Sequence, residues 1–146
     1  MLPLCFFFLN LIEKKKTRSK LQIEFENIEN NLFINSYDSG YVIINKKKFR
    51  NLISINGNKI VQYDKPNNIY KNTFLDNLIK NADETKKKDL ILFGTGVSVL
   101  NIPEEIKSFF YKNSVKFEIM NSLAAYKTYN ILLHESRNFV SIIKVL

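Results

Sequence analysis

The strongest candidate for a ligand-binding motif is the Gly-Thr-Gly sequence at residues 94–96, which follows an apolar run. A glycine turn between a strand and a helix is where α/β proteins often cradle phosphates. Here the pattern is incomplete, because Val99 stands where a dinucleotide-binding turn has its third glycine, and a Gly-Lys-Ser/Thr ending is absent. Glu104 and Glu105 also place negative charge at the helix start that would meet a phosphate. We therefore interpret the segment as a sharp backbone turn, with a small-molecule site as the alternative.

Residue combinations for catalysis or metal binding are absent from the sequence. The chain has one histidine, His134, and one cysteine, Cys5, so a His/Cys zinc site cannot be assembled within it. Glu135 and Ser136 follow the histidine, but neighbours in sequence near a helix end do not establish a catalytic triad. We expect a protein that is not an enzyme, with no catalytic residue, no cofactor and no metal.

A polar and aromatic helix face near the C-terminus is the second candidate site. Tyr126 and Asn130 are four residues apart, which places both on one face of a helix. With Tyr129 they could line a cleft or contact a partner; alternatively, Tyr129 fills the core with its hydroxyl hydrogen-bonded. The candidate partner or cleft residues are Tyr37, Gly94, Thr95, Gly96, Tyr126, Tyr129 and Asn130.

The first half of the chain has the patterns of strands and turns. Apolar and polar residues alternate over residues 21–26, as in a half-buried strand. Residues 36–40 and the lysines at 46–48 are expected to form turns. Asn-Gly at residues 56–57 favours a type I′ hairpin. We expect a β-meander, whose further strands cover residues 32–34, 41–44, 49–55 and 59–63.

The second half alternates helices and strands. An apolar stripe predicts a helix over about residues 73–81. Pro103 suits the first position of a second helix, and Asn121 or Ser122 can cap a third. The strands are expected over residues 89–93, 115–119 and 137–145, and the later helices over 103–112 and 122–134. This order predicts a three-layer α/β domain, in which helices flank a mixed β-sheet.

Length and charge bound the remaining possibilities. A chain of 146 residues has room for one domain, which we expect over residues 21–146 behind a variable leader over residues 1–20. The leader is apolar first and basic second, the reverse of a secretory signal, and its apolar part is too short to span a bilayer. A misassigned start, a weak membrane anchor and a presequence all fit it. Half of the net charge of +8 lies in this leader, so no specific nucleic-acid partner is expected.

Several segments resemble the complex I assembly factor 3 family, whose members are mitochondrial, bacterial and archaeal. They are Ser-Tyr-Asp-Ser-Gly-Tyr at residues 36–41, the apolar run ending in Gly-Thr-Gly at 90–96, and Glu-Ile-Met at 118–120 followed by Thr-Tyr-Asn at 128–130, Leu-Leu at 132–133 and Glu-Ser-Arg at 135–137. The chain departs from the family pattern at Asp38, Asn121 and Ser136, and no Trp follows the hairpin.

The resemblance spans about residues 21–146 and implies a three-layer fold with a mixed sheet. It also implies a non-catalytic helper in the assembly of respiratory complex I (NADH dehydrogenase), with complex I subunits or other assembly factors as protein partners. The expected compartment is the cytoplasm if the host is bacterial, with the mitochondrial inner membrane as the alternative, and any membrane association is peripheral. The alternative function is a small-molecule-binding protein or enzyme that uses the glycine turn.

Overall fold

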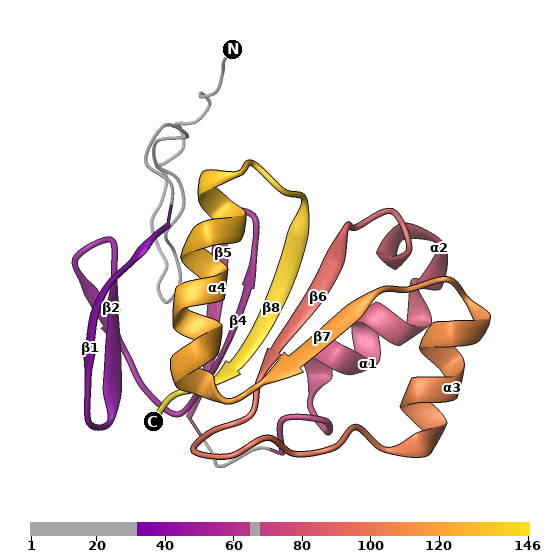
Figure 1. Cartoon of the computed structure of the whole chain (residues 1–146), viewed down its shortest axis with the longest axis horizontal. Coiled ribbons are helices and arrows are strands. Elements are labelled where there is room, and N and C mark those ends of the chain that lie inside the picture. Colours follow the sequence, from indigo (N-terminus) through magenta and orange to yellow (C-terminus); the bar gives the residue numbers. More distant parts are fainter. Residues whose placement is uncertain (1–31, 65–67) are drawn as a thin grey trace.

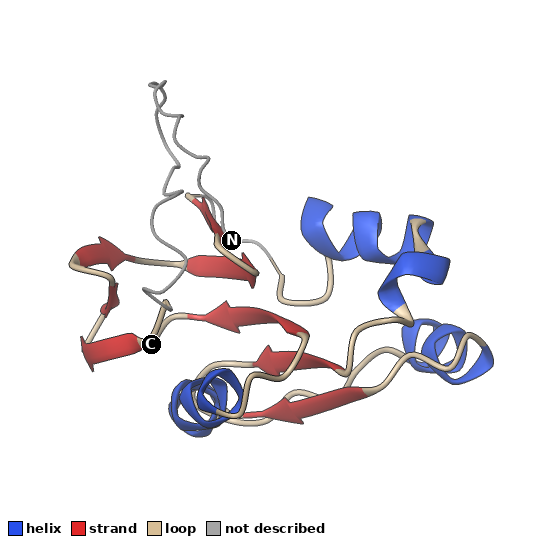
Figure 2. Ribbon diagram, turned by 90° about the horizontal axis from the view of Figure 1, so that it is seen from above, coloured by secondary structure: helices blue, strands red, loops and turns tan. Residues whose placement is uncertain are grey.

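The computed structural model describes residues 32–64 and 68–146, and the predicted leader and the strand over 21–26 lie outside them. The described chain forms one α/β domain with two sheets (Figure 1). A three-stranded antiparallel sheet has the order β1-β2-β3, and a five-stranded mixed sheet has the order β5-β4-β8-β6-β7. Helices lie on both sides of the larger sheet (Figure 2). The predicted fold class is confirmed.

The small sheet consists of β1 (Ile34–Asp38), β2 (Tyr41–Ile44) and β3 (Lys47–Phe49). Its two turns are shorter than predicted. Residues 36–38 extend β1, and the first turn is confined to residues 39–40. Asn45 and Lys46 both take positive φ, 51° and 69°, and form the second turn as a two-residue connection. The remaining lysines of the triplet therefore belong to β3 and not to a turn.

A backbone break separates the two sheets and divides the strand predicted over residues 49–55. Asn51 takes a left-handed φ of 68°, and its carbonyl accepts a hydrogen bond from Val145 N–H at 2.6 Å. The chain then enters the larger sheet as β4 (Leu52–Asn56) and returns as β5 (Lys59–Tyr63). The predicted hairpin is present, but Gly57 is its one turn residue with positive φ, at 64°, whereas a type I′ turn needs two.

The centre of the larger sheet is built by apolar strands, as expected for strands buried on both faces. These are β6 (Leu90–Gly94) and β8 (Phe139–Lys144), with β7 (Phe117–Met120) at the edge. β8 pairs antiparallel with β4 and parallel with β6, which pairs parallel with β7. The sheet is thus mixed.

The four helices are α1 (Thr73–Lys80), α2 (Ala82–Thr85), α3 (Glu104–Lys112) and α4 (Ser122–His134). Asn72 and Asn121 cap α1 and α4, each side chain accepting a backbone N–H at 2.8 Å. Pro103 is the N-cap of α3 and not its first helical residue. One core cluster joins α4 and the small sheet to one face of the larger sheet, and a second joins α1 and α3 to the other face.

Candidate functional site

The Gly-Thr-Gly turn lies at the carboxyl end of β6, and its backbone donors are engaged within the fold. Thr95 N–H donates to the Met120 carbonyl at 2.9 Å, and Gly96 N–H donates to Ser122 Oγ at 2.8 Å. The Thr95 hydroxyl donates to the Ser98 carbonyl at 2.7 Å. A phosphate at this turn would have to displace these bonds, so the geometry favours a structural turn.

Gly94 allows α4 to approach β6 closely. A Cβ at this position would lie 2.8 Å from Ala125 Cβ and 3.1 Å from a methyl carbon of Ile143. The first distance is shorter than real Cβ contacts allow. The absence of a side chain therefore serves helix packing and does not open a ligand loop.

The two tyrosines of the predicted helix face are part of the core, each 1% exposed. The Tyr129 hydroxyl donates to the Leu32 carbonyl at 2.9 Å, and burial raises the pKa of Tyr129 above its ordinary value. The Tyr126 hydroxyl accepts a hydrogen bond from Leu146 N–H at 3.1 Å, and burial raises its pKa as well. The core alternative for Tyr129 is confirmed, and neither ring has surface to offer a partner.

The side chain of Asn130 is hydrogen-bonded to the small sheet. Its side-chain amide bonds both backbone groups of Ile34, at 2.8 and 2.9 Å. Tyr37 is 43% exposed, and its ring centroid lies 4.8 Å from that of Tyr126. The structure thus brings the motif around Tyr37 together with α4, as a packed interface whose outer side is the Tyr37 ring.

The sequence reasoning missed an exposed apolar patch beside the glycine turn. It consists of Val97, Val99, Leu100 and Leu123, which are 86%, 54%, 48% and 41% exposed. The Gly96 carbonyl accepts the Ser122 N–H at 2.8 Å, which brings the loop and the start of α4 side by side. A usable signal was present, because three of the four residues that follow the glycine turn are apolar although no strand or helix is expected there.

Hydrogen bonds to Leu100 fix the far end of the loop that carries three of the four patch residues. Leu100 N–H donates to Thr95 Oγ1 at 3.1 Å, and its carbonyl accepts from the Tyr70 hydroxyl at 2.6 Å. Burial raises the pKa of Tyr70 to about 12, so this hydroxyl keeps its proton at neutral pH. The patch is therefore presented on an ordered loop.

Neither a metal cluster nor a membrane-crossing helix is found in the described ranges. No group of three or more His, Cys, Asp or Glu residues in 32–64 and 68–146 could hold a metal ion. Across the same residues, no helix combines the length and the apolar character that a bilayer requires.

Known proteins share both sequence and fold with this chain. A Francisella tularensis subsp. holarctica (strain LVS) protein named 13 kDa major membrane protein is 30% identical over 126 residues, covering 84% of this chain and 98% of that protein. A Bartonella henselae structure described as an outer membrane protein has a TM-score of 0.64 at 23% identity, covering 77% of this chain and 92% of that one. A Bordetella pertussis structure described as an Mth938-like domain has a TM-score of 0.63 at 20% identity, covering 87% and 92%.

These structural similarities establish the Mth938-like fold. The family is established by sequence. A family model described as "Protein of unknown function (DUF498/DUF598)" matches residues 34–143, from the first residue of β1 almost to the end of β8. The chain belongs to this DUF498/DUF598 family.

Proposed function

We propose that this protein is a non-catalytic binding factor that assists the assembly of a membrane-bound protein complex, with respiratory complex I as its client. The observation that carries the proposal is the apolar patch. Its three loop residues are exposed within four positions of one another, and the Gly96–Ser122 backbone hydrogen bond brings their loop beside the start of α4, which carries the exposed Leu123. Large exposed apolar patches on folded domains are typical of interaction sites, and this group of residues is the candidate for one.

The order of the loop supports a protein partner. Because Leu100 is fixed through both its N–H and its carbonyl, the loop loses little conformational freedom on binding. Tyr37, whose ring packs on Tyr126 in the α4 turn after Leu123, adds a half-exposed aromatic ring near the patch. Tyrosines are enriched among the residues that dominate binding energy at protein interfaces. The fitting occupant is an apolar segment of another protein.

The choice of client rests on resemblance and on names. The segments at residues 36–41, 90–96 and 118–137 resemble the complex I assembly factor 3 family, whose client is a membrane-bound complex. The names of the Francisella relative and the Bartonella structure both contain the words "membrane protein". We place the protein in the bacterial cytoplasm, in contact with a membrane-bound partner, with the mitochondrial inner membrane as the alternative location.

Affinity purification from the protein's own host, followed by mass spectrometry, tests the proposal. Leu123→Asp places a charge in the patch and should reduce partner recovery at least about tenfold, the equivalent of about 1.4 kcal/mol. Ile131→Asp is the matched control, because Ile131 is also an exposed apolar residue of α4, 56% exposed, and lies outside the patch.

Complex I subunits or assembly factors should copurify with the normal chain and with the Ile131 variant. Recovery of a different multi-subunit membrane complex would retain the binding role and remove complex I as the client. Recovery of no partner, or equal loss with both variants while the protein stays folded, would overturn the proposed function.

A further inference from the structure

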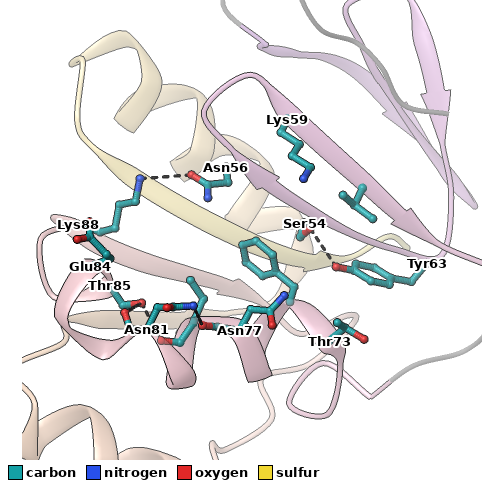
Figure 3. Close-up of a pocket in the computed structure, with 13 residues that line it drawn as sticks. Ser54, Asn56, Lys59, Tyr63, Thr73, Asn77, Asn81, Glu84, Thr85 and Lys88 are labelled. Atoms are coloured by element: carbon teal, nitrogen blue, oxygen red, sulfur yellow. Dashed lines mark hydrogen bonds between the residues drawn. The ribbon is translucent and has the colours of Figure 1, made fainter. Parts of the chain in front are cut away.

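A groove with a volume of about 650 Å³ lies between the β4–β5 hairpin and α1, as Figure 3 shows. It is on the face of the larger sheet that α1 and α3 cover, opposite α4. Its size is within the range of small-molecule sites, about 300 to 1,000 Å³. Nothing proposed for the apolar patch uses this groove.

The side-chain periods of β5 and α1 determine which residues face the groove from its two walls. Lys59, Val61 and Tyr63 are two residues apart on β5 and therefore point to the same face of the sheet. Phe74 and Leu78 are four residues apart on α1 and face them from the helix. The facing surfaces of strand and helix are thus largely apolar, with the Lys59 ammonium at one end and the Tyr63 hydroxyl at the other.

A buried hydroxyl interrupts the floor of the groove. Ser54 on β4 is 1% exposed, between the apolar neighbours Leu52 and Ile142 on the same sheet face. Its Oγ lies 3.4 Å from the Tyr63 hydroxyl oxygen, at the long limit of a hydrogen bond. Because the hydrogen bond between them is this long, the two hydroxyls can each form a further hydrogen bond with a ligand. A few placed polar groups in an apolar pocket are what orient a ligand.

The hairpin end of the groove is positively charged. The Lys88 ammonium donates to Asn56 Oδ1 and Asn138 Oδ1, both at 3.3 Å, and these neutral oxygens do not cancel its charge. In Figure 3 the Lys59 side chain reaches toward the groove above Ser54. Glu84 also lines this end, but its carboxylate is paired with Lys87 at 3.3 Å. The charge here favours an anionic group.

We propose that the groove binds a small organic carboxylate with a flat apolar body. The body packs between Val61 and the α1 residues Phe74 and Leu78. The carboxylate is held by Lys59, and a polar substituent reaches the hydroxyls of Ser54 and Tyr63. An ammonium and a carboxylate form a charge-assisted hydrogen bond, stronger than a neutral one.

A nuclear magnetic resonance titration of the full chain tests this site with 2-naphthoate, and with 2-naphthamide as the uncharged probe of the same shape. The naphthoate should shift backbone amide signals of β4, β5 and α1 and bind at least about tenfold more tightly than the amide. Lys59→Gln should remove most of that preference for the carboxylate, because only Lys88 then remains as a lysine in the groove lining. Lys80→Gln, also an exposed lysine but on α1 outside the groove lining, should preserve it.

Asn77→Asp provides a second variant that leaves the shape of the groove almost unchanged. It adds a negative charge to the α1 wall and should weaken naphthoate binding while sparing the amide. The proposal is overturned if naphthoate shifts no groove signals up to its solubility limit, if the amide binds equally well, or if both lysine variants behave alike. Spread of the shifts over surface lysines, without a groove response, would show nonspecific charge attraction and also overturn it.

Discussion

The side-chain amide of Asn130 bonds both backbone groups of Ile34, accepting its N–H at 2.8 Å and donating to its carbonyl at 2.9 Å. The Asn130 carboxamide on α4 therefore makes the two hydrogen bonds that a neighbouring strand would make to the first residue of β1. The adjacent Tyr129 donates to the Leu32 carbonyl. These bonds couple the small sheet, and with it Tyr37, to the helix that begins at the apolar patch.

Removing the Asn130 amide should destabilise this coupling. In Asn130→Ala the two backbone groups of Ile34, which is 5% exposed, lose their partners, and we expect a loss of about 2–3 kcal/mol in the free energy of unfolding. Urea unfolding measures the loss, and hydrogen exchange at the Ile34 amide should accelerate. Asn81→Ala is the control, because the Asn81 amide makes one exposed bond to its own helix. Unchanged exchange at Ile34 would show that other contacts hold β1.

Two fully buried serines should respond in opposite ways to removal of the hydroxyl. Ser122 Oγ accepts from Gly96 N–H and donates to the Lys144 carbonyl, whereas Ser141 Oγ has no hydrogen-bond partner among the described residues. Ser122→Ala should cost about 2–3 kcal/mol, because the buried Gly96 N–H and the partly buried Lys144 carbonyl lose their partner. Ser141→Ala should be neutral or stabilise by up to about 1 kcal/mol. Thermal and urea unfolding compare the two variants, and an equal cost would contradict the hydrogen-bond assignment.

Local sequence patterns predicted an element well where a capping residue and an apolar stripe determine its bounds. The asparagine cap and the apolar stripe placed α4 almost to the residue, ending at His134. The break at Asn51 was not predictable in this way, since apolar residues continue on both sides of it. It depends on Val145, which donates to the Asn51 carbonyl from the other end of the sequence.

The candidate site was harder to predict than the fold. Tyr129 and Asn130 stood out as residue types suited to binding, but their partners Leu32 and Ile34 lie almost a hundred residues earlier. Periodicity within one segment contains no information about such pairs. It also does not distinguish the core face of a strand from a groove floor, which is why Ser54 drew no attention in the sequence.

Packing at Gly94 should make this position intolerant of a methyl group. Because a Cβ there would lie 2.8 Å from Ala125 Cβ, Gly94→Ala should cost about 1–3 kcal/mol, the range for overpacked cores. The double variant with Ala125→Gly removes the clashing atom. Its loss of stability should therefore be smaller than the sum of the losses of the two single variants, one of which is the cost of a glycine in a helix. Urea unfolding of the two single variants and the double variant gives the coupling energy. Strict additivity would mean that the clash is relieved elsewhere.

Stability at alkaline pH should depend on Tyr129. Burial raises the pKa of this hydroxyl in the folded protein, so the folded state holds the proton more tightly than the unfolded state, whose pKa is about 10. The resulting contribution to stability is complete below about pH 10 and is lost as the pH rises through the folded value. Above about pH 10 the free energy of unfolding should therefore fall, with this one group adding up to about 1.4 kcal/mol per pH unit to the slope.

Tyr129→Phe keeps the ring in the core and removes the titrating group. Its free energy of unfolding should be lower than normal at neutral pH, because the Leu32 carbonyl loses its donor, but should fall less steeply between about pH 10 and about pH 11. Tyr111→Phe, at a ring that is 66% exposed, should keep the slope of the normal chain. Urea unfolding at a series of pH values measures all three proteins. If the Tyr129 variant keeps the full slope, then other groups govern alkaline unfolding, and the proton on Tyr129 does not stabilise the junction between α4 and the small sheet.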